Sequence, residues 1–393
     1  MKVIYITHYT DLYGANKSLL DLIEGLSSDV DFHLVVPNEG RLTTVASKRN
    51  IPYTIIPFYN EVYFKGQDQQ LDFKRVMTER AKGIVKFLHN WRLVIKHSSL
   101  FKDYDIIHMN SSATLIGAYF SLWTRKKLVW HIREFGWQDY KFRYNFGYKY
   151  FMFWLNKADT VISISKAIYQ KRVIDSKAGI KKIVYNGVIS IKTLKQHIEA
   201  ISNKKEEPQK EFVFALVGHL SEEKGQLEAL RAFHQLYTKC KNIRLILAGS
   251  GPDDYTAMLK AYVQELGLGA NVDFTGYIAD IRGVYTSIDC LLMCSKHEAL
   301  GRVTIEAMSF GKPVIGYDAA GTKEIIQDGE NGLLYLGEAD VLAEKMAILA
   351  LDKALQEKLS RNAFNSVKKF TIEEYAETVK DIYASLTVSE SIN

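Results

Sequence analysis

Short apolar runs and longer amphipathic stretches alternate along the entire chain. Apolar runs rich in β-branched residues are typical of buried strands, whereas apolar residues recurring at every third or fourth position are typical of helices. Their alternation favours parallel sheets covered by helices on both faces. We expect strands at residues 2–7, 31–37, 53–58, 104–110, 127–132, 160–165, 212–218, 242–249, 272–276, 290–295, 313–318 and 332–335, with helices between them.

A polar segment separates the two halves of this pattern. The stretch NKKEEPQK, residues 203–210, carries one of only six prolines, as linkers between domains often do. The predicted fold class is therefore α/β, with two Rossmann-like, doubly wound domains. The predicted boundaries are a first domain at 1–189, a linker at 190–210, a second domain at 211–365 and a closing amphipathic helix at 366–393.

The composition fits a globular protein with two cores, since the 393 residues are 47% apolar and 24% charged. No stretch approaches the roughly 20 apolar residues of a membrane-spanning helix. The first residues, MKVIYITHYT, have the pattern of a strand rather than of a signal peptide. We therefore expect a cytoplasmic protein.

The two halves of the chain differ in charge. Residues 1–205 carry 32 Lys and Arg against 17 Asp and Glu, a net charge of +15, whereas residues 206–393 carry 19 against 28, a net charge of −9. A basic half predicts an anionic partner, such as a membrane surface or a charged polymer. Nucleic-acid binding would require an affinity that falls steeply with added salt, and we expect no nucleic-acid partner.

The stretch HEALGRVTIEAM, residues 297–308, places two carboxylates on either side of a glycine. The pattern puts Glu298 in a strand-to-helix loop and Glu306 on the helix that follows. Unpaired amides in the first helical turn, from Leu300 to Val303, attract a phosphate, whereas carboxylates accept hydrogen bonds from hydroxyls. A phosphate flanked by hydroxylated rings describes a nucleotide-sugar. Two solvated glutamates without a ligand are the alternative interpretation.

Loops after other strands of the second half carry matching features. Ligands of open α/β sheets gather beyond the carboxyl ends of strands, and VGHLSEEKG, residues 217–225, offers Gly218 and Lys224 there. A lysine suits a diphosphate. Gly249 follows the next strand, where a glycine lets the backbone approach a ligand closely. Tyr277 follows the strand after that and is a candidate for stacking on a base.

Together with GKPVIGYDAAGTKEII, residues 311–326, these motifs resemble the retaining glycosyltransferases of family four, also called group 1. The resemblance extends over nearly the whole chain. It implies the GT-B fold, in which two Rossmann-like domains face each other across a cleft. It also implies a transferase of the EC 2.4 class that uses a nucleoside diphosphate sugar. Asp103 and Asp105 have the spacing of a metal-binding Asp-x-Asp but lie where a strand begins, so we expect no metal and no other cofactor. Glu298 is then expected beside the transferred sugar and Glu306 at the ribose hydroxyls.

The resemblance assigns roles in both domains. The implied donor-binding residues are Gly14, Gly218, His219, Lys224, Gly249, Tyr277, Leu300, Gly301, Arg302, Val303 and Glu306. Gly14 matches a glycine loop whose backbone approaches the diphosphate, and His131 matches a histidine beside the reacting sugar. The predicted catalytic residues are Glu298, His131 and Lys224, with retention by front-face attack and no protein nucleophile. A purely structural histidine at the end of a strand is the alternative for His131.

One position departs from the pattern of the family. Where relatives commonly carry arginine, this chain has His219, which lacks a bidentate guanidinium and is mostly neutral near pH 7. Arg302 is a candidate to compensate, with a surface arginine or one that contacts the acceptor as the alternatives. The alternative function is therefore a catalytically weak GT-B subunit that binds and stabilises a partner glycosyltransferase. An epimerase of related fold fits the two-glutamate motif less well.

The first domain supplies the acceptor candidates. Asn110 and Ser111 follow the strand at 104–110 and are predicted to contact the acceptor, with helix capping as the alternative. Residues 140–157 mix cations and aromatics as lipid-facing surfaces do, with packed aromatics and snorkelling lysines as the alternative. We expect a glycan or lipid-linked acceptor in the synthesis of a bacterial surface polysaccharide. The protein is then peripheral on the cytoplasmic face of the cell membrane.

Overall fold

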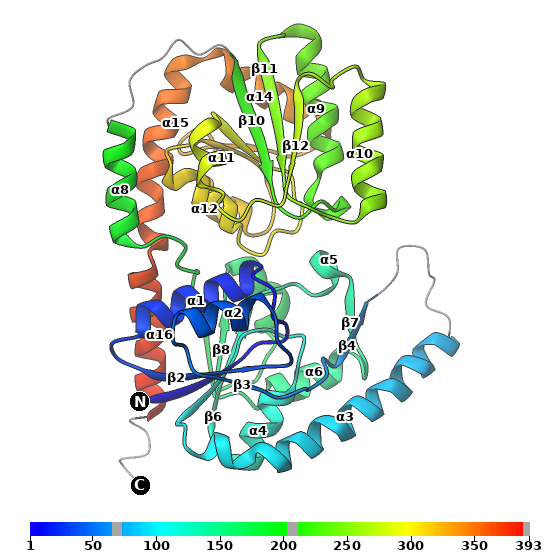
Figure 1. Ribbon diagram of the computed structural model, residues 1–393, viewed down its shortest axis with the longest axis vertical. Coiled ribbons are helices and arrows are strands. Elements are labelled where there is room, and N and C mark those ends of the chain that lie inside the picture. Colours follow the sequence, from blue (N-terminus) through cyan, green and yellow to red (C-terminus); the bar gives the residue numbers. More distant parts are fainter. Residues whose placement is uncertain (65–72, 203–210, 388–393) are drawn as a thin grey trace. The chain divides into compact units, whose positions relative to one another are not determined.

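The computed structural model describes residues 1–64, 73–202 and 211–387 (Figure 1). The chain forms two compact units. The amino-terminal unit contains Met1–Gly187 and the C-terminal segment that begins at Ile372, and the carboxy-terminal unit contains Val188–Thr371. Each unit has a parallel sheet at its centre.

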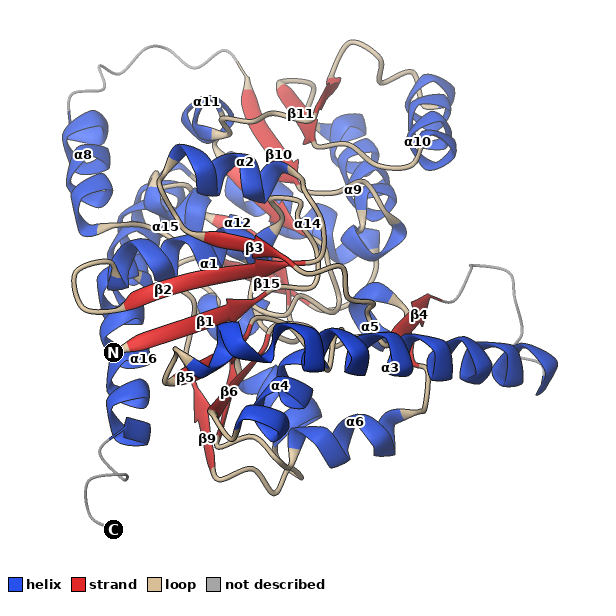
Figure 2. Cartoon of the chain, turned by 60° about the horizontal axis from the view of Figure 1, so that its bottom comes forward, coloured by secondary structure: helices blue, strands red, loops and turns tan. Residues whose placement is uncertain are grey.

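The amino-terminal unit covers its sheet with helices on both faces (Figure 2). Its parallel strands lie in the order β3 (Tyr53–Ile55), β2 (Asp31–Val36), β1 (Lys2–Ile6), β5 (Ile106–Met109), β6 (Lys127–Ile132), β8 (Thr160–Ser163) and β9 (Ile180–Ile183). Its helices are α1 (Gly14–Leu26), α2 (Arg41–Lys48), α3 (Phe73–Lys102), α4 (Ile116–Thr124), α5 (Trp137–Tyr140), α6 (Tyr148–Leu155), α7 (Lys166–Ile168) with a π-helical turn at Tyr169–Val173, and α16 (Ile372–Thr387). Two short strands, β4 (Val62–Phe64) and β7 (Phe142–Tyr144), pair antiparallel beside the sheet.

The carboxy-terminal unit repeats this architecture with six parallel strands. They lie in the order β12 (Val272–Gly276), β11 (Ile243–Ala248), β10 (Phe212–Val217), β13 (Cys290–Met293), β14 (Val314–Tyr317) and β15 (Leu333–Tyr335). The helices are α8 (Ile191–Ser202), α9 (Gln226–Lys239), α10 (Asp253–Glu265), α11 (Arg282–Ser287), α12 (Arg302–Ser309), α13 (Thr322–Ile325), α14 (Ala339–Leu351) and α15 (Lys353–Ser366), with 3₁₀ turns at Glu222–Lys224 and Val367–Phe370.

The strand order of each sheet reverses direction at its centre. In the amino-terminal unit β1 lies between β2 and β5, and in the carboxy-terminal unit β10 lies between β11 and β13. In open α/β sheets, ligands bind outside the carboxyl ends of the strands at such a reversal. The expected ligand sites are therefore the β1 and β5 loops of one unit and the β10 and β13 loops of the other.

All twelve predicted strands are present, and the predicted α/β class is confirmed. Within the described residues the sheets contain three further strands, β4, β7 and β9. β9 lies at the edge of its sheet and carries Lys181 and Lys182, and none of its four residues is fully buried. An edge strand exposes one side to water, so it lacks the continuous apolar run by which the central strands are recognised.

The structure differs from the predicted linker at 190–210. Residues 191–202 form helix α8, which packs within the carboxy-terminal unit, since the ring of His197 lies 3.8 Å from that of Phe310 and bonds to the Ser309 carbonyl at 3.0 Å. Residues 203–210, the polar core of the predicted linker, lie outside the described residues. The polar stretch at 203–210 therefore did not indicate that the residues just before it form a helix of the carboxy-terminal unit.

The predicted boundaries near the C-terminus also change. The carboxy-terminal unit continues to Thr371, where the Val188 amide bonds to the Phe370 carbonyl at 2.9 Å. Helix α16, which lies within the closing helix predicted at 366–393, packs against α1, and its Val379 and Tyr383 are buried in the amino-terminal core. Counted by these units, net charge is +8 for the first, from 29 basic and 21 acidic residues, and −2 for the second, from 22 and 24.

Candidate active site

The candidate site of the carboxy-terminal unit starts where β10 and β11 end. Gly218 and Gly249 follow these strands in extended backbone with positive φ, and the Gly218 amide bonds to the Ala248 carbonyl at 2.9 Å. A Cβ on Gly249 would lie 1.7 Å from the Gly218 carbonyl oxygen. Any side chain at position 249 would therefore separate the two loops, which explains glycine there without a ligand.

Lys224 and Glu298 meet at this edge of the sheet. The Lys224 Nζ lies 2.6 Å from the Glu298 Oε2, and the side chains are 34% and 16% exposed. Gly225, at φ +75°, brings the lysine loop onto the end of β13, because a Cβ there would lie 2.6 Å from the Cys294 Cβ. The structure thus joins two predicted site residues that lie 74 positions apart in the sequence.

The loop from Glu298 to Gly301 leads directly into α12. Gly301 is the N-cap at φ +95°, and Leu300 is buried. The Thr304 amide bonds to the Gly301 carbonyl at 3.0 Å, so the main-chain amides before it lie at the helix N-terminus, which favours anions. The Gly321 amide, from the loop after β14, fixes the Glu298 carbonyl at 2.8 Å.

Glu306 lies on α12 with two partners. Its Oε2 accepts a hydrogen bond from the Tyr285 hydroxyl at 2.9 Å, and its Oε1 lies 3.3 Å from the Arg302 Nε. Tyr285 is buried, and burial followed by the Glu306 charge raises the pKa of its hydroxyl well above the usual range. A carboxylate has about four lone-pair sites, so Glu306 keeps the capacity to accept hydrogen bonds from a ligand. Arg302 pairs with Glu306 rather than standing on the surface alone.

The loop that carries His219 is held by a residue that the sequence pattern did not single out. Gln226 is completely buried, donates to the His219 carbonyl at 2.9 Å and accepts from the Ser221 amide at 3.3 Å. The His219 side chain is exposed. Tyr277 follows β12 and is also exposed, by 51%.

In the amino-terminal unit, His131 lies buried near the end of β6, as predicted. Burial, the Arg133 charge and His108 together lower the pKa of His131 well below its usual range. Arg133 donates to the Nδ1 of His131 at 3.2 Å, which leaves the proton of the neutral ring on Nε2. That Nε2 has no hydrogen-bond partner among the described residues. His131 is therefore suited to donate a hydrogen bond and unsuited to act as a base.

Arg133 joins several loops at the carboxyl edge of this sheet. It donates to Asn110 Oδ1 at 2.6 Å, Asn186 Oδ1 at 2.6 Å and the Tyr375 hydroxyl at 2.9 Å. These partners follow β5 and β9 and lie on α16, so one buried guanidinium fixes three elements. This arrangement could not be predicted from sequence, because the partners are dispersed along the chain.

The predicted acceptor residues face inward. Asn110 is completely buried and held by Arg133, and Ser111 donates to the Glu134 Oε1 at 2.8 Å. The Ser112 amide and hydroxyl donate to the same oxygen, at 2.6 and 2.8 Å. The helix-capping alternative is not met either, because the N-cap of α4 is Leu115 and makes no side-chain bond. Ser111 and Ser112 therefore position Glu134, a buried carboxylate that the sequence analysis did not single out, while Asn110 accepts from Arg133.

Gly14 is the first residue of α1. A Cβ added there would meet no atom within 4 Å, so packing within the protein does not require glycine at this position. The loop before it is fixed by Asn16, which donates to the Tyr9 and Asp11 carbonyls at 3.0 and 2.8 Å. A ligand that approaches the backbone would account for this glycine.

The segment 140–157 follows the packed-aromatics alternative for the most part. Phe142, Tyr144, Phe151 and Trp154 are buried, and only some of its aromatics are exposed, such as Phe153. The rings of Tyr144 and Phe151 stack at 4.5 Å. These aromatics therefore mainly stabilise the amino-terminal unit.

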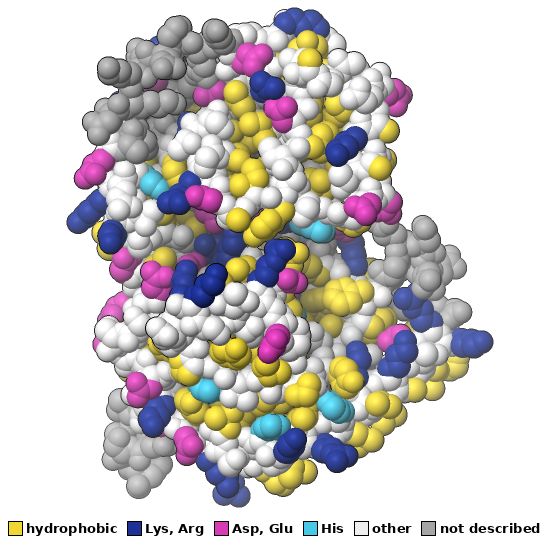
Figure 3. Space-filling view, in the orientation of Figure 1, with side chains coloured by type: hydrophobic (Ala, Val, Ile, Leu, Met, Phe, Trp, Pro, Cys, Tyr) yellow, Lys and Arg dark blue, Asp and Glu magenta, His cyan; other side chains and the backbone are white. Residues whose placement is uncertain are grey.

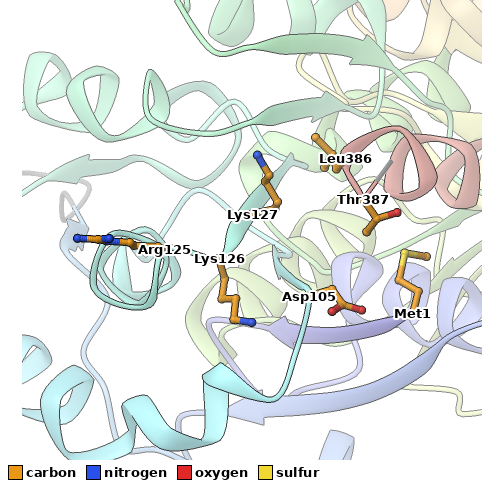
Figure 4. Close-up of a pocket in the computed structure, with 7 residues that line it drawn as sticks. All are labelled: Met1, Asp105, Arg125, Lys126, Lys127, Leu386 and Thr387. Carbon is orange, nitrogen blue, oxygen red and sulfur yellow. The ribbon is translucent and has the colours of Figure 1, made fainter. Parts of the chain in front are cut away.

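A cavity also lies at the opposite edge of the amino-terminal sheet (Figure 4). Its lining includes Met1, Asp105 and Lys127, which stand at the amino ends of β1, β5 and β6. Ligands of open α/β sheets bind at the carboxyl ends of strands. We therefore do not assign this cavity to the candidate active site.

Two family models match the chain. The model for glycosyl transferases group 1 matches residues 197–366, and that for glycosyltransferase family 4 matches residues 13–189. EpsD of Bacillus subtilis is 30% identical over 176 residues, which are 44% of this chain and 46% of EpsD. The capsular polysaccharide biosynthesis glycosyltransferase CapM of Staphylococcus aureus is 26% identical over 251 residues, 60% of this chain and 66% of CapM. The chain thus aligns with about half to two thirds of these relatives.

Similarity in structure extends further than similarity in sequence. Anabaena Alr3699/HepE, solved in complex with UDP-glucose, is similar with a TM-score of 0.75 at 24% sequence identity, over 98% of this chain and 100% of that one. At this level of identity the likeness establishes a common fold.

Proposed function

Because the chain belongs to the glycosyltransferases of group 1 and family 4, we propose that it transfers a sugar from a nucleoside diphosphate donor to an acceptor hydroxyl, with retention of configuration. The observation that carries this proposal is the Lys224–Glu298 ion pair of 2.6 Å at the loop that opens α12. It combines a cation, a carboxylate and a helix N-terminus in one site, as the three chemical parts of a nucleotide-sugar require.

Departure of the nucleoside diphosphate is the step that this site favours. Negative charge grows on the leaving phosphate, and electrostatic stabilisation at that point usually contributes most to catalysis. Lys224 and the amides that open α12 supply this stabilisation. Glu298 holds the lysine in place and also contacts hydroxyls of the sugar. Glu306 binds the ribose, fixed for that purpose by Tyr285 and Arg302.

His131 positions the sugar in this proposal. Its low pKa keeps the ring neutral, and its Nε2–H lacks a protein partner among the described residues. A buried donor without a partner is costly unless a ligand accepts its hydrogen bond. The acceptor proton then goes to the departing phosphate in a front-face reaction, which needs no protein base.

The acceptor is proposed to be a glycan or a lipid-linked sugar of a bacterial surface polysaccharide. CapM, a similar protein, is named for capsular polysaccharide biosynthesis. The positive net charge of the amino-terminal unit supports this acceptor, because a positive unit is attracted to the anionic surface of a membrane that holds a lipid-linked sugar.

The alternative, a catalytically weak subunit that stabilises a partner glycosyltransferase, rests on His219. The exposed imidazole cannot replace a guanidinium fork. Lys224 nevertheless retains its ion pair with Glu298, so the cation needed at the leaving group is in place. An active enzyme is therefore the better-supported proposal.

Thermal shifts with a panel of nucleotide-sugars, UDP-glucose first because HepE was solved with it, test donor binding. A ligand that binds the folded state raises its stability according to concentration over Kd. Glu306→Ala should reduce the thermal shift with the selected donor. We expect an affinity about tenfold weaker, because about one to two hydrogen bonds to the donor are lost. Anomeric analysis of the product by NMR tests retention.

Three results would count against the proposal. No nucleotide-sugar stabilises the protein, Glu306→Ala leaves the affinity unchanged, or the product has inverted configuration. Donor binding without transfer or hydrolysis, together with co-purification of a second glycosyltransferase, would instead favour the stabilising-subunit alternative.

A further inference from the structure

Helix α3 exposes an apolar face that no described element covers. Phe73, Met77, Ile84, Leu88 and Ile95 are 81%, 47%, 52%, 61% and 57% exposed. Successive members of this set lie four or seven positions apart, so they align along one side of the helix. These five residues are the α3 apolar stripe.

The other side of α3 is firmly packed, which fixes the direction in which the stripe points. Gly83, Asn90, Val94 and Phe101 are buried, and a Cβ on Gly83 would lie 2.7 Å from the Asn145 side chain. Helix α4 packs against α3 and adds the half-exposed Trp123, whose ring lies 6.3 Å from that of Trp91. The stripe is therefore a fixed surface of the amino-terminal unit.

Cations flank the stripe on both sides. At about 100° of rotation per residue, Arg80 falls on one side of it and Arg92 and Lys96 on the other, and all three are exposed. Figure 1 places α3 at the lower right of the molecule. In the same place, Figure 3 shows hydrophobic side chains with lysines and arginines among them. Helix α3 carries eight Lys and Arg and one Glu, a net charge of +7. Nearly all of the +8 of the amino-terminal unit thus resides on this helix.

We propose that α3 lies in the headgroup region of an anionic lipid bilayer, with its apolar stripe toward the acyl chains and its cations on the lipid phosphates. The proposal deepens the membrane location included in the proposed function. A stripe of apolar residues bordered by Lys and Arg suits this interface, because both kinds of side chain find a partner there.

Other occupants satisfy only part of this surface. A second copy of the chain would bring two helices of net charge +7 together, and like charges repel. A nucleic acid would pair with the cations but would leave the apolar stripe in water. Of the helices in the described residues, none has the length and apolarity to cross a bilayer, so α3 is proposed to lie in the plane of the interface.

Flotation of the full chain with phosphatidylcholine vesicles, with or without phosphatidylglycerol, tests the proposal. We expect binding to the anionic vesicles and little to the neutral ones. The double variant Leu88→Ser, Arg92→Glu should lower the partition coefficient on anionic vesicles at least tenfold. Both side chains are exposed, so folding should be unaffected.

The matched control is Leu351→Ser, Lys353→Glu in the carboxy-terminal unit, where both residues are also exposed. It likewise replaces a leucine by serine and a cation by glutamate, and it should bind within about twofold of the unmodified protein, since a substitution away from the interface changes little. Equal loss in both variants, unchanged binding in the α3 variant, or equal binding to neutral and anionic vesicles would overturn the proposal. So would a dimer that dissociates only in the α3 variant.

Thermal shift with the selected nucleotide-sugar is measured on the same variants. It should be unchanged by Leu88→Ser, Arg92→Glu, because α3 lies outside the candidate active site. Vesicle binding that depends on α3 without any donor binding would overturn the proposed function alone. Donor binding without vesicle binding would overturn the α3 proposal alone.

Discussion

Lys224 and Glu298 each reduce the electrostatic cost of placing the other beside a charged ligand. The pair is partly exposed, at 34% and 16%, and exposed pairs contribute only about 0–1 kcal/mol to folding. The ion pair therefore contributes little to the free energy of folding, and its proposed importance is for binding and catalysis. At the same scale, Arg133 shows the opposite balance, because it is buried and bonded to several loops.

Replacing Lys224 by alanine should reduce kcat by about 100-fold or more, because a stabilising charge at the leaving group is lost. The free energy of unfolding should change by less than about 1 kcal/mol. Lys296, on the loop that carries Glu298 and 44% exposed, is the control. Its alanine variant should transfer sugar within about twofold of the original rate, and a fully active Lys224→Ala protein would remove the lysine from the mechanism.

Acidification should destabilise the amino-terminal unit through His131. Its folded-state pKa is lowered by burial, so below about pH 6.5 the unfolded chain takes up a proton that the folded chain does not. Stability is lost as pH falls from there toward the folded pKa, with a slope of up to about 1.4 kcal/mol per pH unit for one histidine. Urea unfolding at several pH values, with His131→Asn as the comparison, measures this slope. An equal slope in the variant would exclude His131 as its source.

At the scale of elements, two glycines are explained differently, one by packing within the protein and one by the approach of a ligand. Gly249 is required by the neighbouring loop, whereas Gly14 opens α1 with free space around its α-carbon. The same contrast applies to helices, since α16 buries its large apolar residues, whereas α3 exposes several of its own. An element with unfilled space or an uncovered face is where a partner is expected.

Gly14→Ala should keep or slightly raise the melting temperature, because alanine favours a helix over glycine by up to about 1 kcal/mol. Its transfer rate should nevertheless fall if the donor diphosphate approaches this backbone. Gly249→Ala should instead destabilise the carboxy-terminal unit directly, because the new Cβ collides with the Gly218 carbonyl. Unchanged transfer in Gly14→Ala would place the donor elsewhere.

For the whole molecule, the chain path determines which unit a mutation affects. The chain leaves the amino-terminal unit after Gly187 and returns to it at Ile372, so α16 belongs to a core whose other members begin at residue 3. The charge follows the same division, with +8 on the first unit and −2 on the second.

Val379→Ala on α16 should destabilise the amino-terminal unit by about 1–3 kcal/mol, the range for removing buried methyl groups. Hydrogen exchange should rise in α1, which packs on α16, although α1 lies far away in sequence. Val263→Ala, equally buried on α10, is the matched change in the carboxy-terminal unit and should leave exchange in α1 unaltered. Faster exchange in α15 of the Val379→Ala protein would contradict this assignment.

The sequence by itself determined the two parallel sheets, the family and the placement of Glu298 and Glu306 around the start of one helix. These features depend on local periodicity and on residues within one strand-to-helix segment. Only the tertiary structure decided that Lys224 pairs with Glu298, that Asn110 and Ser111 turn inward, that α8 and α16 belong to opposite units and that α3 keeps an uncovered face. Those outcomes depend on contacts between distant residues, and a helix reveals its free face only once the packing of its other face is known.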